Sequence, residues 1–299
     1  MNLLRLKVVL AAIDNDDASL AVLDTARMLA DAGGAALHVV HVTSSKTATE
    51  VSPNEIVDTV TSMLARAKVS LDPARTHIIA GEPAHAIRML GDRIRADVIV
   101  LGPHRERHEK KRGLGGTALA IATVSWAPCL IVKRGLRLPL ERVLVPVDLS
   151  DTARGALMVA LSWSSALRAG TETSETSAPT ELTAMYVDRS EGGKQRGGGT
   201  IPELEAELNG VRAEAGRWAG VGIESITIVA SDVADAIAER AREGRADLIV
   251  LGTRGQGLDA VGRLGSVSGA VIRSIDAPVL LVPPAVWASF VTPNSGRPR

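Results

Sequence analysis

Aromatic residues make up only 2% of this 299-residue chain, and cysteine occurs once. Any buried core must therefore be built from aliphatic side chains, which the 45% hydrophobic content can supply. The single cysteine, Cys129, has no partner for a disulfide or for a cysteine-based metal site. Its position in the apolar run "APCLIV" predicts a buried and inert thiol.

The chain also lacks an excess charge and a long apolar run. Its 34 basic residues balance 34 acidic ones, so nothing electrostatic favours a nucleic-acid or acidic-membrane partner. No uninterrupted apolar stretch approaches the roughly 18 residues of a membrane-spanning helix. The opening segment predicts a strand interrupted by Arg5 and Lys7, not a signal peptide. We expect a cytoplasmic protein with no membrane or nucleic-acid partner.

An internal repeat is the strongest feature that the sequence does contain. "RADVIVLGP" at 95–103 recurs as "RADLIVLGT" at 245–253, and "APCLIV" at 127–132 recurs as "APVLLV" at 277–282. Both pairs are separated by 150 positions. Because the repeated unit has the length of an ordinary domain, it predicts two similar domains and not a solenoid.

The start of each copy is offset differently. "VLAAIDNDDAS" at 9–19 parallels "VLVPVDLSDTA" at 143–153, a separation of 134, so the second copy carries an early insertion. We place the first domain at 1–136, the second at 137–285, and a C-terminal tail at 286–299. The tail is expected to be partly disordered, with Trp287 docked.

Apolar runs without alternating polarity are interleaved with segments of helical spacing in both copies. Runs such as "KVVLAAID" and "RVLVPVD" are typical of strands buried on both faces. The first helix should stop at Gly33 and Gly34, and its counterpart at Gly170. The pattern predicts an α/β fold of two tandem, doubly wound, five-stranded parallel-sheet domains of Rossmann-like type. Ligands of such sheets bind at the carboxyl ends of the strands.

A glycine-rich loop follows the fourth strand of the second copy. Its spacing is Gly252, two residues, Gly255, nine residues, Gly265 and then Ser266. The glycines allow the main chain to approach a ligand closely, and the next helix presents unpaired N–H groups at its start, which suits phosphates. Asp148, at the end of the first strand of this copy, could accept hydrogen bonds from a ribose.

Two simpler interpretations compete for each of these residues taken alone. The glycines could only form a surface loop, and Ser266 could only cap its helix; their joint spacing favours a site. "GQGLDA" at 255–260 fits a loose dinucleotide pattern, but that fingerprint belongs on a first strand-to-helix turn. A Walker-type lysine followed by serine or threonine is absent, which excludes P-loop chemistry.

With these residues the sequence resembles the universal stress protein family in its tandem, two-domain form. The resemblance is carried by "VLVPVDLS", "ADLIVLGTRG" and "GLDAVGRLGSVSGAVIRSIDAPVLLV", which reproduce the family's Gly-x2-Gly-x9-Gly-Ser signature. That signature marks the ATP-binding branch. The resemblance covers both copies and therefore most of the chain.

The resemblance implies ATP with Mg²⁺ in the second domain. Asp148 would take the ribose or adenine side, Val147 and Val187 would flank the base, and the loop glycines and the helix start would hold the phosphates. The implied contacts are Pro146, Val147, Asp148, Val187, Gly252, Arg254, Gly255, Gly265, Ser266, Val267 and Ser268. It also implies pairing of the two domains through their last strands, a homodimer, and an unknown protein partner in a stress response.

The first copy departs from this pattern. Asp14 matches Asp148 and Gly102 matches Gly252, but Arg105 stands where Gly255 stands. A degenerate site there would use Asp14, Gly102, Gly115, Gly116 and Thr117. Binding of ATP to the first domain is left open.

All six histidines fall in the first copy. His104 and His108 have a spacing that suits a metal on a helix, but no further ligand completes a set. His38 and His41 lie on a predicted strand, where one can be core and the other surface. We expect structural or solvated histidines and no metal site.

No dedicated catalytic base can be identified, although Arg254, Arg263 and Asp148 could serve either binding or hydrolysis. We expect a nucleotide-dependent regulatory module with at most slow, weak ATPase activity. The alternatives are a ligand-free interaction scaffold, or an adenylating enzyme. The latter needs a Ser-Gly-Gly-rich loop that "VDLSDTARGA" lacks.

Overall fold

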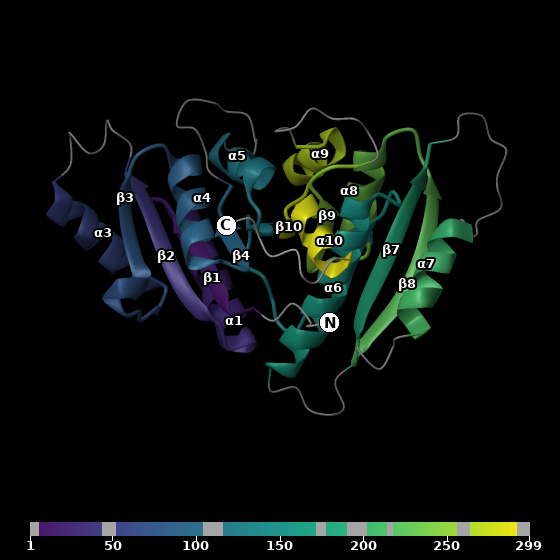
Figure 1. Ribbon diagram of the computed structural model, residues 1–299, viewed down its shortest axis with the longest axis horizontal. Coiled ribbons are helices and arrows are strands. Elements are labelled where there is room, and N and C mark those ends of the chain that lie inside the picture. The colour runs from purple at the N-terminus through teal and green to yellow at the C-terminus, as the bar shows by residue number, and fades with distance from the viewer. Residues whose placement is uncertain are drawn as a thin grey trace. The chain divides into compact units, whose positions relative to one another are not determined.

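The computed structural model describes residues 6–43, 52–103, 116–171, 178–189, 202–213, 218–255 and 264–291. The chain divides into two compact units whose boundary falls between Leu136 and Arg137. Figure 1 colours the first from purple to teal and the second from teal to yellow.

The first unit alternates strands with helices. Its elements are β1 (Val8–Ile13), α1 (Ala18–Gly33), β2 (Ala36–Thr43), α3 (Pro53–Arg66), the 3-10 turn η1 (Pro73–Arg75), β3 (Thr76–Ala80), α4 (Pro83–Ile94), β4 (Val98–Leu101), α5 (Gly116–Val124) and β5 (Cys129–Ile131). The strand order is β3-β2-β1-β4-β5, and every pair is parallel. The chain reverses its direction of winding between β1 and β4, so the switch point lies there.

The second unit repeats this plan. Its elements are β6 (Arg142–Pro146), α6 (Asp151–Ala169), β7 (Thr180–Asp188), α7 (Pro202–Ala213), β8 (Val221–Val229), α8 (Val233–Glu243), β9 (Leu248–Gly252), α9 (Ser266–Ser274), β10 (Val279–Val282) and α10 (Pro284–Val291). The strand order is β10-β9-β6-β7-β8, again all parallel. The predicted fold of two doubly wound five-stranded sheets is confirmed.

Local sequence explains where several helices begin and end. Gly34 adopts φ 62°, a left-handed conformation that ends α1, and α6 ends at Gly170, both as predicted. Pro83 occupies the first turn of α4. Arg95 and Arg245, which correspond in the repeat, end α4 and α8 with φ of 55° and 48°. The two copies thus share even an unusual backbone feature.

Aliphatic side chains form the core of each unit, as the composition requires. The interior strands β4 and β9 are buried almost throughout. Cys129 is buried on β5, and burial raises the pKa of its thiol to about 12, so the predicted inert thiol is confirmed.

The C-terminal segment differs from the predicted tail. Residues 284–291 form α10, which contacts α6, and the two helices are drawn close together in Figure 1. A Cβ on Gly155 of α6 would lie 3.2 Å from the Cβ of Trp287. Trp287 therefore packs against α6, as expected, but it belongs to the helix α10 and not to a disordered tail. Residues 292–299 lie outside the described part of the chain.

Among the described residues, no helix combines the length and apolar character needed to cross a membrane.

The described residues contain no group of three or more histidine, cysteine or acidic side chains placed to hold a metal ion. His104 and His108 lie outside the described residues. On β2, His41 is buried with Nδ1 3.1 Å from the carbonyl oxygen of Ile13, whereas His38 is half-buried, which confirms the core-and-surface division.

Candidate functional site

A pocket of about 430 Å³ lies at the switch point of the second domain, where β6 and β9 end side by side. The structure brings together in its lining all the residues that the sequence predicted for this domain. These are Pro146, Val147, Asp148, Val187, Gly252, Arg254, Gly255, Gly265, Ser266, Val267 and Ser268.

Asp148 is fixed by the turn that leads from β6 into α6. Its Oδ1 accepts hydrogen bonds from the N–H of Ser150 at 3.0 Å and from the Ser150 hydroxyl at 2.6 Å. The intervening Leu149 adopts φ 64°, which a non-glycine residue takes only where its surroundings enforce it. The turn therefore holds a half-buried carboxylate in a defined place at the pocket.

Glycine at position 255 allows this carboxylate to approach the loop after β9. A Cβ on Gly255 would lie 2.5 Å from Oδ2 of Asp148, closer than any real contact. Gly252 is equally confined, because a Cβ there would lie 2.8 Å from Cγ2 of Thr152 in the first turn of α6. Both glycines are required by close approach and not by a left-handed backbone.

The start of α9 offers main-chain donors to the pocket. Gly265 is the N-cap residue and provides no side chain to cap the helix. The first helical hydrogen bond runs from the N–H of Gly269 to the carbonyl oxygen of Gly265 at 3.0 Å. The N–H groups of Ser266, Val267 and Ser268 precede that bond, so the helix does not use them internally. The positive end of the helix dipole lies at the same place.

The family resemblance implies that Ser268 would bind phosphate through its N–H group and its hydroxyl, and the hydroxyl part of this expectation needs a correction. This buried hydroxyl donates to the carbonyl oxygen of Gly252 at 2.8 Å and so ties the start of α9 to the end of β9. A hydroxyl has one hydrogen to donate, so in this arrangement Ser268 offers a ligand its N–H group alone. Ser266, by contrast, is exposed.

Sequence analysis missed part of the lining. The additional residues are Ala153, Met185, Tyr186, Arg189, Val233, Ile237 and Leu251. Val233 and Ile237 are four residues apart, and α8 begins at the same edge of the sheet as the glycine loop. This spacing was a usable signal, since residues four apart on a helix share one face.

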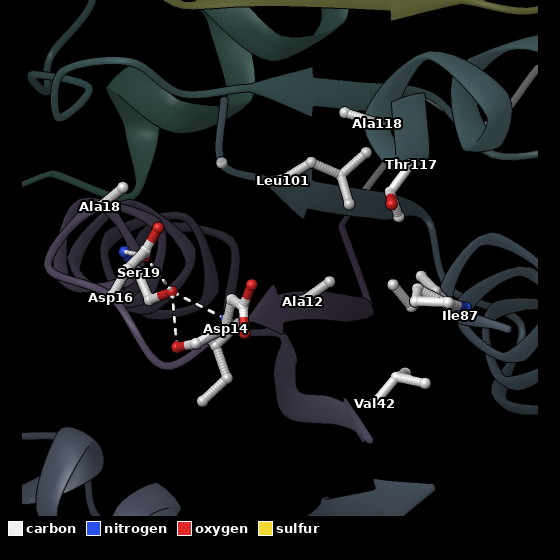
Figure 2. A pocket seen from close by; sticks show the side chains of 13 residues that line it. Ala12, Asp14, Asp16, Ala18, Ser19, Val42, Ile87, Leu101, Thr117 and Ala118 are labelled. Carbon is white, nitrogen blue, oxygen red and sulfur yellow. Dashed lines mark hydrogen bonds between the residues drawn. The ribbon is translucent and has the colours of Figure 1, made fainter. Parts of the chain in front are cut away.

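The corresponding pocket of the first domain is much smaller, about 100 Å³ (Figure 2). Asp14, Gly102 and Thr117 line it, as predicted. Gly116 is the first residue of α5, and Gly115 lies outside the described residues.

Figure 2 shows why the first pocket differs. Ser19 is buried there; its Oγ accepts the N–H of Asp14 at 2.8 Å and lies 3.0 Å from Oδ1 of Asp16. Asp16 stands where the second domain has Ser150, so a second carboxylate replaces the hydroxyl that orients Asp148. Asp14 itself is exposed. This pocket is therefore more acidic and less suited to a polyanion among its described residues.

The fold and the pocket place this chain among the doubly wound α/β proteins with a binding pocket at the switch point. The model of the universal stress protein family matches residues 5–133 and 139–283. The chain belongs to that family, with two tandem domains, as the sequence predicted.

Individual proteins agree with this assignment. A universal stress protein of Thermus aquaticus, described as lying in the QAH/OAS sulfhydrylase 3′ region, is 47% identical over 74 residues, which are 24% of this chain. The chain spans about half, 53%, of the length of that curated relative.

Solved structures show the same architecture over nearly the whole chain. A universal stress protein from Archaeoglobus fulgidus DSM 4304 is similar with a TM-score of 0.65 and 22% identity, over 94% of this chain and 98% of that one. A protein of unknown function from Pseudomonas aeruginosa PAO1 gives 0.63 and 15%, over 96% of both chains. At these identities the likeness establishes the fold.

Proposed function

We propose that the second domain binds ATP and that the protein acts as a nucleotide-dependent regulatory module of a cytoplasmic stress response. The observation that carries the proposal is the start of α9, where three main-chain N–H groups precede the first helical bond in a pocket lined by Arg254. Such donors suit phosphate oxygens. The volume of about 430 Å³ lies within the roughly 300–1,000 Å³ typical of small-molecule sites.

The lining divides into parts that match the parts of a nucleotide. Aliphatic side chains of Val187, Val233 and Ile237 suit an adenine ring, while Asp148 suits a ribose hydroxyl. Arg254 and the glycines lie on the side of α9, where phosphates would be held. The described lining has no carboxylate besides Asp148, so Mg²⁺ would be held chiefly by phosphate oxygens and water.

The same lining argues for slow chemistry at most. Hydrolysis of a γ-phosphate needs a group that orients the attacking water and a positive charge that meets the developing negative charge. Arg254 could supply the charge. Asp148, the one described carboxylate of the lining, is already hydrogen-bonded to Ser150 at the turn into α6. We therefore infer regulation by bound nucleotide and not rapid turnover.

Titration with MgATP is expected to give about one bound nucleotide per chain, because the first-domain pocket is about 100 Å³ against about 430 Å³. Isothermal calorimetry measures this number, and mass spectrometry of gently purified protein identifies any copurified nucleotide. No binding would favour the ligand-free scaffold, and two bound nucleotides would contradict the proposed difference between the domains. A single-turnover assay with labelled ATP then separates a regulatory module from an enzyme.

Gly255→Ala is expected to weaken ATP binding about tenfold, because its Cβ would displace the carboxylate of Asp148 from a contact of 2.5 Å. The matched control is Gly210→Ala in α7, where a Cβ would meet no described residue within 4 Å. Calorimetry of both variants checks the expectation. Equal loss in the two variants, or none in Gly255→Ala, would show that Asp148 does not contribute to the site.

A further inference from the structure

Two histidines of the first domain form a close pair on neighbouring strands. His38 of β2 has Nδ1 3.0 Å from Nε2 of His77 on β3. The two rings stack with centroids 5.4 Å apart and an angle of 8° between their planes. Both side chains are half-buried, so the pair is open to a ligand from solvent.

The surroundings of this pair are cationic. Desolvation, then His77, then Arg75 hold the pKa of His38 below its usual value. Desolvation and then Arg93 do the same for His77. Arg75 belongs to η1 and Arg93 to α4, and no carboxylate is among the groups that shift either histidine.

Neither arginine is neutralised within the described part of the chain. Arg75 and Arg93 are exposed and form no ion pair there. On the same helix as Arg93, by contrast, Arg88 pairs with Asp92 at 3.0 Å. Among the described residues, the cluster of His38, His77, Arg75 and Arg93 therefore carries positive charge without an ion-paired carboxylate.

The second domain shows that the fold does not need this cluster. His38 lies opposite Leu10 in the parallel register, and Thr183 lies opposite the corresponding Leu144. A threonine thus occupies the place of the first histidine in an otherwise equivalent strand pair. Position 38 can be filled without a titratable group.

The charge at this edge of the second domain is balanced as well. Thr183 donates a hydrogen bond to Glu224 at 2.7 Å, and Glu224 lies 3.8 Å from Arg240. An anionic side chain of the protein accompanies the cation there. In the first domain the described carboxylates beside the two arginines are engaged elsewhere: Asp72 accepts the N–H of Ala74 at the start of η1, and Asp92 pairs with Arg88. Neither forms an ion pair with Arg75 or Arg93 in the described part of the chain.

We propose that His38, His77, Arg75 and Arg93 form a binding site for a small tetrahedral oxyanion of the phosphate or sulfate class, and that the imidazoles take up protons when it binds. Arginine guanidinium groups match the oxygens of such anions. Two imidazoles 3.0 Å apart share one hydrogen between their facing nitrogens, and this bond is kept when one ring gains a proton. When both rings are protonated, two N–H donors face each other, and an anion that accepts from both resolves this conflict. The same positive charge opposes a bound metal cation.

The direction of the pH dependence follows from these contacts. Without anion the histidines are held neutral near pH 7, so only the two arginines attract a ligand. A bound dianion stabilises the protonated imidazoles and raises the pKa of both. Affinity must then increase as the pH falls from 8 to 6.

The test is a histidine NMR titration of the full chain without nucleotide. Sodium sulfate is the probe, because its charge stays constant over this range, and sodium chloride of equal ionic strength is the reference. We expect sulfate to raise the pKa of His38 and His77 by about 1 unit. Binding at pH 6 should be several-fold tighter than at pH 8. His38→Gln and His77→Gln assign the two resonances.

Arginine variants decide whether the cluster is responsible. Arg75→Gln and Arg93→Gln, both at exposed positions, should each weaken sulfate binding several-fold, while the matched control Arg88→Gln should not. Equal histidine pKa values in sulfate and chloride would overturn the proposal, as would saturable binding of Zn²⁺ in place of sulfate. Because no nucleotide is present, the result is independent of the ATP site.

Discussion

Replacing Gly265 by aspartate is expected to abolish ATP binding to the second domain while the fold is retained. Gly265 is the N-cap of α9 with φ −55°, a value that any residue can adopt. Aspartate is among the best N-cap residues because its carboxylate accepts N–H groups of the first helical turn. Those N–H groups are the proposed phosphate donors, so the new side chain would both occupy them and repel the phosphates.

The expected loss of affinity is at least 100-fold, about 3 kcal/mol. The helix itself should lose no stability, since a new cap typically contributes about 1 kcal/mol. Calorimetry with MgATP measures the affinity, and thermal unfolding measures the fold. Unchanged affinity in Gly265→Asp would remove the start of α9 from the binding site.

Gly265→Ala separates the added charge from the added bulk. Its Cβ would lie 3.3 Å from the carbonyl oxygen of Thr253 and 3.7 Å from Oγ of Ser268. These contacts are tight but call for shifts of only a few tenths of an ångström. Alanine should therefore bind ATP far better than aspartate does; an equal loss in both variants would show that shape, and not the competing carboxylate, is responsible.

The fold was predictable because buried parallel strands are continuous apolar runs and because the chain contains the pattern twice. The repeat aligned β4 with β9 and β5 with β10, and the ends of the first and fourth strands of the second copy, β6 and β9, then located the site. All the residues predicted for the second domain line one pocket. They follow the carboxyl ends of parallel strands, and these ends meet at one edge of the sheet. What they bind stays a prediction.

Other features depended on contacts that a single sequence does not encode. Nothing in the sequence distinguished the Ser268 hydroxyl as a donor to Gly252 from a donor to a ligand. The hydrogen bonds of Ser19 with Asp14 and Asp16 at the turn after β1 could likewise be seen only in the structure. The pairing of His38 with His77 depends on the order and register of β2 and β3, which the sequence analysis did not assign.

A helix following β10 was also missed. Residues 286–299 were assigned to a partly disordered tail with Trp287 docked. In the structure α10 packs on α6, where Gly155 leaves room for the backbone of Trp287. Gly155 thus allows the backbone of α10 to approach α6 closely, a contact that the sequence analysis did not foresee.

Gly252→Ala is expected to destabilise the second domain by about 2 kcal/mol, whereas the matched Gly102→Ala should change the stability of the first by less than about 0.5 kcal/mol. A Cβ at 252 would lie 2.8 Å from Cγ2 of Thr152 and 3.1 Å from its carbonyl carbon, which is backbone and cannot rotate away. Among the described residues, a Cβ at 102 would meet only Cγ2 of Val22, at 3.4 Å. The two glycines occupy the same place in the repeat, so the comparison isolates the approach of α6 to β9.

Urea unfolding followed by tryptophan fluorescence checks this difference, because Trp163, Trp218 and Trp287 report on the second domain and Trp126 on the first. Adding Thr152→Ser to Gly252→Ala removes Cγ2 but leaves the backbone contact, so it should recover only part of the lost stability. Full recovery would show that the contact with the Cγ2 methyl group of Thr152 accounts for all of the lost stability. Equal losses of stability in Gly252→Ala and Gly102→Ala would mean that close packing against α6 does not require glycine at position 252. The close approach of a bound ligand would then have to explain the glycine.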